Sequence, residues 1–241
     1  PETQARRRAE LAARREAVRR ARTMNVANND LKVINVLMDH AVRWGVIDAN
    51  QIKGNVKYFG ARDGLRKARD RYVEDWELIE WQKVASPVQK AFAAMTLLIA
   101  GRKTDILQIT LADIRKDELR LVNRKSGKEA LYRITPALRE AIDMALSVRT
   151  GDSLYLFTNA RGECFVTNGR CKSFDTSWVR SMRRALDETD LKEPFTRHDL
   201  RAKAGSDADS DYRAQQLLGH TDPSMTRRHY RRNVPLIEPA K

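Results

Sequence analysis

Apolar residues recur at helical spacing along most of the chain. The most apolar run, 87–100, is expected to form a buried central helix. The same spacing predicts further helices over 5–24, 25–44, 76–84, 136–148, 174–189, 196–208, 212–218 and 223–229. Two short runs, 119–123 and 130–134, predict a hairpin with a polar tip at 124–128, and 154–157 is a candidate third strand. The pattern therefore predicts a mainly α fold with a small antiparallel β-sheet, of the α+β class.

The first part of the chain differs in composition from the rest. Residues 5–24 contain eight arginines, which predicts a solvated helix with a basic face, whereas 25–44 is expected to bury one apolar stripe. Residues 53–71 hold seven Lys or Arg and two Asp, a composition that fits either a solvated charge run or a segment lying along phosphates. We divide the chain into a helical region at 1–60, a basic linker at 61–74, a globular domain at 75–232 and a tail at 233–241.

The charge of the chain indicates a polyanionic partner. Its 241 residues include 46 Lys and Arg against 32 Asp and Glu, for a net charge of +14. Nucleic acid is favoured over a membrane, because the longest nearly apolar run, 91–100, is half of the roughly 20 residues that span a bilayer. Cys164 and Cys171 fit neither a disulfide framework nor a zinc site, so we expect a reduced cytoplasmic protein. Because the sequence begins at Pro1 and not at Met, we expect it to derive from a longer chain.

The candidate chemistry is concentrated near the C-terminus. His198 and Arg201 are three residues apart on a predicted helix and so share a face. Thr196 is a plausible N-cap for that helix, with Asp199 placed to complete a capping box. His220 follows a glycine suited to a helix end, which would fix the imidazole at a corner between two helices.

A third element is Tyr230, which lies among arginines 227, 228, 231 and 232. Each of these residues has a plain alternative: a single histidine on a helix is more often structural, and a tyrosine among arginines can simply stack on the surface. Two upstream residues favour a functional interpretation over these structural ones. They are Arg102, after the apolar helix, and Lys125, at the predicted hairpin tip.

These six residues are a set that DNA strand transfer without a metal would need. Two guanidiniums can neutralise the non-bridging oxygens of a phosphodiester, and imidazoles can manage protons near neutral pH. A lysine can protonate a leaving oxygen, and a tyrosine can attack phosphorus to form a covalent intermediate.

The sequence resembles the tyrosine recombinase (phage integrase) family over residues 25–232. LLIAGRKTDILQITLADI resembles the box of the first arginine, with Arg102 in the catalytic position and Asp105 where an acidic residue supports it. NRKSGKEALYRIT resembles the β-hairpin that contains the active-site lysine and gives that role to Lys125. The segment 24–50 is similar to the last helices of the core-binding domain that precedes the catalytic domain in this family.

Two further boxes complete the resemblance. FTRHDLRAKA matches the HxxR box, which gives His198 and Arg201, and LLGHTDPSMTRRHYRR matches the final box, which gives His220 and the nucleophile Tyr230. The resemblance implies the family's catalytic-domain fold, preceded here by a helical segment. The N-terminal half of a core-binding domain and any arm-type DNA-binding domain are absent from this sequence.

The resemblance also implies a mechanism. Tyr230 attacks the scissile phosphate, forms a 3'-phosphotyrosyl link and frees a 5'-hydroxyl, which then attacks the partner strand's link. Arg102 and Arg201 stabilise the phosphorane, His220 donates a hydrogen bond, His198 helps to remove the tyrosine proton and Lys125 is the acid. Neither a cofactor, ATP nor a metal is required.

The same resemblance implies the partners. They are double-stranded DNA with att-type or inverted-repeat core sites, three further copies in a homotetramer on DNA, and accessory DNA-bending or directionality proteins. Without DNA the protein is expected to be a monomer. The expected location is the cytoplasm, at the nucleoid.

Some features depart from the family pattern. Ten positions separate His220 from Tyr230, where nine is commoner, and the stretch from Arg201 to His220 is shorter than in many members. Lys128 is a weaker rival for the role of Lys125, because hairpin tips tolerate shifts.

Three functions compete at this stage: a site-specific recombinase of the integrase type, a type IB topoisomerase, and a DNA-binding module with a decayed pocket. The tail at 233–241 contains Val234-Pro235-Leu236-Ile237 and either docks on a neighbouring protomer, as recombinase tails do, or packs on its own domain.

Overall fold

The computed structural model describes residues 2–63 and 69–232. It divides into two compact units, Pro1–Arg69 and Asp70–Lys241. The division lies inside the expected basic linker, and the end of that linker is part of the second unit, because Val73 is fully buried in its core. No helix among the described residues is both long enough and apolar enough to cross a membrane.

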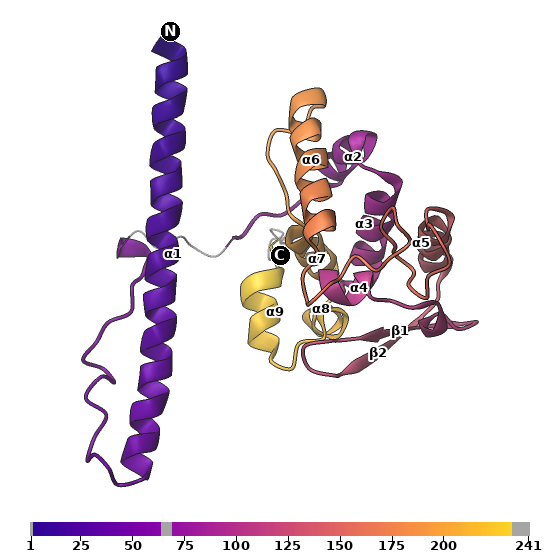
Figure 1. Cartoon of the computed structure of the whole chain (residues 1–241). Coiled ribbons are helices and arrows are strands. Elements are labelled where there is room, and N and C mark those ends of the chain that lie inside the picture. The colour runs from indigo at the N-terminus through magenta and orange to yellow at the C-terminus, as the bar shows by residue number, and fades with distance from the viewer. Residues whose placement is uncertain (1, 64–68, 233–241) are drawn as a thin grey trace, which may run out of the picture. The chain divides into compact units, whose positions relative to one another are not determined.

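The first unit consists of one long helix and a segment that runs back along it. Helix α1, Glu2–Arg43, is continuous where two successive helical runs were expected, and a left-handed Gly45 follows its end. The side chain of Asn28 donates to the Phe59 carbonyl (2.9 Å) and accepts from the Phe59 N–H (2.8 Å). Asn50 donates to Asp39 at 3.0 Å. These polar contacts hold the returning segment beside α1 (Figure 1).

The expected burial of an apolar stripe by 25–44 is wrong for much of that stripe. Val26, Ile34 and Leu37 are 52%, 40% and 58% exposed. The spacing of these residues predicted the helix correctly. The returning segment is held by asparagine side chains, and its own apolar residues Val56, Tyr58 and Phe59 are 43%, 44% and 42% exposed, so the stripe is left largely uncovered.

The second unit is mainly helical, as predicted. Its elements are α2 (Asp75–Val84), α3 (Pro87–Ile99), α4 (Lys103–Leu107), β1 (Glu118–Val122), β2 (Glu129–Arg133), α5 (Pro136–Ser147), α6 (Lys172–Glu188), α7 (Arg197–Ser206), α8 (Asp211–Leu218) and α9 (Pro223–Tyr230). Short 3-10 turns lie at Ala61–Asp63 in the first unit and Leu111–Asp113 in the second. The short helix α4, which follows Arg102, was not predicted.

Helix α3 is the centre of the core. It packs against α5 on one side and α7 on the other. Phe92, near its middle, contacts Phe174 (ring centroids 4.8 Å apart) and Trp178 (6.3 Å) of α6 edge-to-face, and all three side chains are almost fully buried. This core fixes the C-terminal end of α3, from which the first candidate site residue follows.

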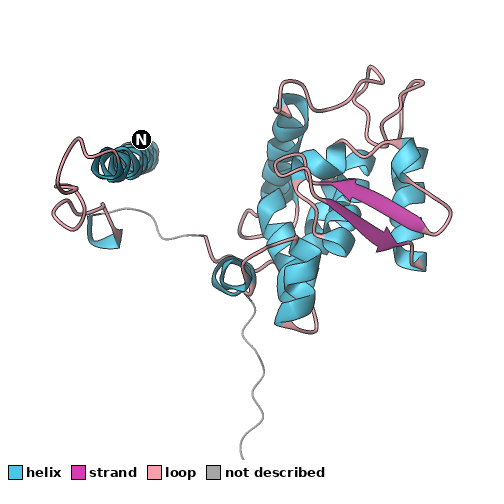
Figure 2. Cartoon of the chain, turned by 90° about the horizontal axis from the view of Figure 1, so that it is seen from below, coloured by secondary structure: helices cyan, strands magenta, loops and turns pink. Residues whose placement is uncertain are grey.

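The predicted hairpin is present and forms the only sheet in the described part of the chain. Strands β1 and β2 are antiparallel, with Leu121 opposite Ala130 and Leu119 opposite Tyr132. Leu119 and Leu121 are buried, and the hairpin lies against the helices of the second unit in both views (Figures 1 and 2).

The expected third strand at 154–157 does not join this sheet. Leu154 and Leu156 instead make backbone hydrogen bonds with Leu111 and Ile109, as part of a loop. The run is apolar because Leu156 and Phe157 face the core, and burial alone does not distinguish a strand from an irregular segment.

Candidate active site

Helix α7 places two of the predicted residues on one face. Thr196 accepts a hydrogen bond from the Asp199 N–H, and the Asp199 carboxylate accepts one from the Thr196 N–H, so the predicted capping box is confirmed. His198 lies in the first turn and is exposed, whereas Arg201 lies one turn later and is 4% exposed. Both line a cavity of about 360 Å³.

The Arg201 guanidinium joins the ends of two helices. Its Nη1 donates to the Ala100 carbonyl after α3, and its Nη2 donates to the Leu218 carbonyl at the end of α8 (2.6 Å). Within the described residues, its buried Nε has no hydrogen-bond acceptor. Burial lowers the pKa of Arg201, but an arginine remains charged in proteins. The Nε–H of this cation is therefore left for a ligand oxygen.

Arg102 lies directly before α4 and faces the same cavity. Its side chain is 37% exposed, and its Nη1 is 3.9 Å from Oδ2 of the buried Asp105. The other oxygen of Asp105 accepts the backbone N–H of Arg124, at 3.2 Å. This carboxylate therefore links the first arginine to the hairpin tip. The residue before Arg102 is Gly101, and a larger residue would not fit there because its Cβ would be 2.7 Å from the Ile106 side chain.

The corner between α8 and α9 positions His220. Gly219 ends α8 with a φ of +62°, as the sequence predicted, and Asp222 caps α9 by accepting from the Ser224 N–H. His220 Nδ1 and the hydroxyl of the buried Thr226 share a hydrogen bond of 2.9 Å. This bond fixes the plane of the ring.

Tyr230 is the last residue of α9 and is surrounded by the other candidates. It is 9% exposed, and its ring centroid lies 4.7 Å from that of His220 and 5.3 Å from that of His198. The guanidinium carbon of Arg201 is 5.7 Å from the Tyr230 centroid. Four of the six predicted residues, Arg102, His198, Arg201 and Tyr230, thus line one cavity, and His220 packs against the Tyr230 ring.

Lys125 is not brought to this cavity. It lies in the exposed turn of the hairpin, and among the described residues its side chain makes no hydrogen bond or ion pair. Lys128, the rival residue, donates to the Thr221 hydroxyl (3.3 Å) and lines an adjoining cavity of about 220 Å³ together with Arg102 and Arg201.

The surroundings of both histidines favour the neutral imidazole. Burial, followed by the positive charges of Arg201 and Arg102, lowers the pKa of His220 to about 4. Burial, followed by Arg232 and Arg201, also lowers the pKa of His198. A neutral imidazole donates from one nitrogen and accepts at the other, so each ring is able to take up or pass on a proton.

The depressed pKa of His220 makes stability depend on pH. Because an unfolded imidazole titrates near 6.5, the unfolded chain binds more protons between pH 6.5 and about 4, and the folded state loses stability as the pH falls through this window. We expect a loss of about 1 kcal/mol from this partly solvated group, measured by urea unfolding at pH 7 and pH 4.5. His220→Gln should flatten the profile, and an unchanged slope in that variant would contradict the assignment.

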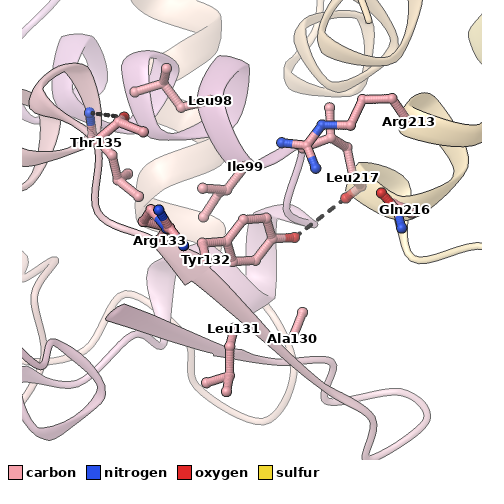
Figure 3. A pocket seen from close by; sticks show the side chains of 11 residues that line it. Leu98, Ile99, Ala130, Leu131, Tyr132, Arg133, Thr135, Arg213, Gln216 and Leu217 are labelled. Atoms are coloured by element: carbon pink, nitrogen blue, oxygen red, sulfur yellow. Dashed lines mark hydrogen bonds between the residues drawn. The ribbon is translucent and has the colours of Figure 1, made fainter. Parts of the chain in front are cut away.

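A further cavity, of about 690 Å³, contains no predicted site residue. It is bounded by α3, β2, α5 and α8, and Figure 3 shows Tyr132 reaching from β2 toward Leu217. The Tyr132 hydroxyl donates to the Leu217 carbonyl at 3.4 Å, and burial raises its pKa. Tyr132 therefore supports the end of α8 beside the carbonyl that Arg201 binds.

Several residues that shape the site were missed by sequence reasoning. Thr226 orients His220, while Ser206 and Arg232 hold the backbone around Tyr230. The four-residue interval between Asp222 and Thr226 places Thr226 on the first turns of α9, but nothing local indicates which side chain it meets. Ser206 and Arg232 depend on contacts between α7 and the end of α9, which no spacing in the sequence reveals.

Comparison with known proteins adds a family and a fold. The family profile described as "Phage integrase family" matches residues 77–235. No curated protein matches the sequence. Among solved structures, a lambda integrase (75–356) dimer bound to a COC' core site is similar at 18% identity and a TM-score of 0.64, over 92% of this chain and 88% of that chain.

Two further structures share the fold. A lambda integrase tetramer bound to a Holliday junction has 19% identity and a TM-score of 0.63, over 86% of this chain and 60% of that chain. The Tn1549 transposon integrase (aa 82–397) in complex with circular intermediate DNA has 15% identity and a TM-score of 0.64, over 89% of this chain and 78% of that chain. At these identities the likeness establishes the tyrosine recombinase catalytic fold.

Proposed function

The chain belongs to the phage integrase family, and on that premise we propose that it is a site-specific recombinase of a phage, prophage or mobile element that cuts and rejoins DNA through a 3'-phosphotyrosyl intermediate. The observation that supports this most is the contact of the Tyr230 ring with His198, His220 and Arg201, beside a cavity that Tyr230, His198 and Arg201 line. A buried tyrosine among cationic groups is a poor surface anchor but a well-placed nucleophile.

The geometry suggests a role for each group. A phosphate in the cavity would meet Arg102 from the solvent side and the unpaired Nε of Arg201 from the core side. These cations stabilise the negative charge that grows on the phosphorane oxygens as the Tyr230 oxygen attacks. The neutral His198 ring accepts the phenolic proton, while His220 donates to a phosphate oxygen.

The substrate we propose is double-stranded DNA with att-type or inverted-repeat core sites, bound by a homotetramer. The net charge of +14 supports a polyanionic partner. The lambda integrase structures, which contain a dimer on a core site and a tetramer on a Holliday junction, support an assembly on DNA. A DNA substrate of this kind places the protein in the cytoplasm, at the nucleoid.

Covalent trapping tests the proposal. Duplexes tiled across the DNA that flanks the gene, each with a nick near the cut, release a short 5'-hydroxyl fragment and leave the protein attached to the 3' end. We expect an adduct on one tile in EDTA and without ATP, and Tyr230 in the adducted peptide. Failure to form an adduct on any tile would support the decayed DNA-binding module. Relaxation of a supercoiled plasmid that lacks the tile would support a type IB topoisomerase.

A change of the leaving group tests which hairpin lysine, Lys125 or Lys128, is the acid. If Lys125 protonates the 5' oxygen, Lys125→Ala should slow cleavage by about 100-fold or more. A substrate with sulfur at the 5' bridging position should relieve that defect, because a thiol, with a pKa near 8.5, leaves without a proton. Lys128→Ala, in the same turn, is the matched control. If the sulfur substrate rescues Lys128→Ala instead, the acid is Lys128, which lies nearer to Arg102 and Arg201.

The role of the tail is a separate proposal. Residues 233–241 lie outside the described residues, and we propose that they dock on a neighbouring protomer. Deletion of 233–241 should then leave cleavage of a single nicked site intact but abolish strand exchange between two sites. Strand exchange at the normal rate by the truncated protein would refute the proposal.

A further inference from the structure

The backbone on either side of Tyr230 is held by one hydroxyl. Ser206, the last residue of α7, is 1% exposed, and its Oγ donates to the Tyr230 carbonyl at 2.6 Å. The same Oγ accepts the backbone N–H of Arg232 at 2.8 Å. The turn that follows the nucleophile is therefore attached to the helix that contains His198 and Arg201.

Arg232 adds a second attachment in the same place. Its Nη1 lies 2.7 Å from the Asp199 carboxylate and donates to the Arg71 carbonyl at 2.9 Å, and its Nε donates to the His229 carbonyl at 3.0 Å. The Arg232 side chain is 6% exposed, and Asp199 is fully buried. Since Asp199 also caps α7, a single carboxylate orients the helix of the HxxR pair and the residue two positions after Tyr230.

The carbonyl that Arg232 binds belongs to the first segment of the second unit, which is itself fixed to α7. The Arg71 guanidinium binds Glu77 (3.0 Å). The next residue, Tyr72, accepts from Lys203 of α7 at 3.1 Å. Lys203 is 4% exposed and also pairs with Asp75 at 2.7 Å. The Arg71–Glu77 pair and the Lys203 ammonium are largely buried, although Asp75 is exposed, and these contacts make residues 71–75 a support for the Arg232 side chain.

We propose that Ser206 and Arg232 are positioning residues for the nucleophile. They set the position of the Tyr230 oxygen relative to His198 and Arg201, and Arg232 connects that position to the start of the second unit at Arg71. The proposal rests on the proposed function of Tyr230. Neither side chain touches the cavity that would hold the phosphate, so both act through the backbone of the nucleophile. At Gly205, which precedes Ser206, a Cβ would be 2.8 Å from Leu218 Cδ1 and 3.4 Å from Tyr230 Cβ, so α7 passes close to α8 and to Tyr230 here.

The first measurement is the single-turnover rate of adduct formation by the full chain on saturating nicked DNA. Ser206→Ala should lower that rate by about 10-fold to 100-fold while the Kd for DNA stays unchanged, because a displacement of about 1 Å costs this much in a positioned reaction. Ser181→Ala is the matched control. Ser181 is also a buried serine that donates to a backbone carbonyl (Trp178, 3.0 Å) and accepts an N–H, but it lies in the core, away from Tyr230.

Arg232 is tested by two substitutions. Arg232→Lys keeps the charge beside Asp199 but cannot reproduce all three contacts, so it should recover part of the rate that Arg232→Met loses. Equal rates for wild type and Ser206→Ala, or an equal rate loss in Ser206→Ala and Ser181→Ala, would overturn the proposal.

A second measurement does not depend on activity. Fluorotyrosine incorporated into the free protein gives a ¹⁹F resonance for position 230, assigned by its loss in Tyr230→Phe. Ser206→Ala and Arg232→Met should shift or broaden this resonance, whereas Ser181→Ala should not. If wild type forms no adduct but the resonance responds in this way, the proposed function fails and the positioning of Tyr230 stands. An unchanged resonance refutes the positioning even if adducts form.

Discussion

Tyr230→Phe is expected to abolish the covalent adduct on nicked DNA, with at least a 10⁴-fold loss of cleavage rate. The substitution removes only the phenolic oxygen, which is the attacking atom, and no neighbouring group can replace a nucleophile. The ring stays, so its contacts with His220 and His198 should be kept. DNA binding and the free energy of unfolding should change by about 1 kcal/mol or less. Denaturing gels detect the adduct, and urea unfolding checks the fold.

Tyr132→Phe is the matched control for this prediction. Tyr132 is also a largely buried tyrosine of the second unit, and its hydroxyl donates to the Leu217 carbonyl away from the cavity of Tyr230. We expect normal adduct formation after this change. A covalent adduct formed by Tyr230→Phe would mean that another residue attacks; Tyr212, exposed at the start of α8, would then be tested next.

Local rules predicted the helices of the second unit well, because the signals that start them are contained in a few residues. Ser86 before Pro87 and Thr135 before Pro136 cap their helices through side-chain hydrogen bonds within three residues. The errors concern partners that are distant in sequence. Residues 154–157 are apolar enough for a strand, but their partners are loop residues near Ile109 and not the hairpin.

The site was predictable to the extent that its residues lie in motifs. His198, Arg201, His220 and Tyr230 were identified from their spacing and their resemblance to one family. In the structure His198, Arg201 and Tyr230 line one cavity with Arg102, and His220 packs against Tyr230. The spacing gave no means of choosing between Lys125 and Lys128, because a flexible turn of polar residues has no core contact that fixes its register.

The spacing also did not show that Arg201 is structural. Its two carbonyl partners, Ala100 and Leu218, are 101 and 17 residues away in the sequence. Only the fold brings them together, so a motif that marks an arginine for phosphate binding says nothing about the backbone it supports.

Arg201→Ala is therefore expected to lose both activity and stability. Removal of the guanidinium leaves the Ala100 and Leu218 carbonyls without their donor in a buried place, which should lower the free energy of unfolding by about 3 kcal/mol or more. Adduct formation should fall by at least 10³-fold, because a cation is lost from the phosphate site. Arg201→Lys should recover little of either, since an ammonium cannot reach two carbonyls and a phosphate in the geometry of a planar fork.

Arg102→Ala separates the loss of activity from the loss of stability. Arg102 faces the same cavity, but its side chain is 37% exposed and its carboxylate neighbour, Asp105, keeps a second partner in the Arg124 N–H. We expect a comparable loss of adduct formation with a change in unfolding free energy below about 1 kcal/mol, because a half-exposed ion pair contributes little. Urea unfolding and single-turnover cleavage on the same preparations measure both quantities. If Arg201→Ala proved as stable as Arg102→Ala, the two carbonyl contacts would not support the fold, and Arg201 would serve the phosphate alone.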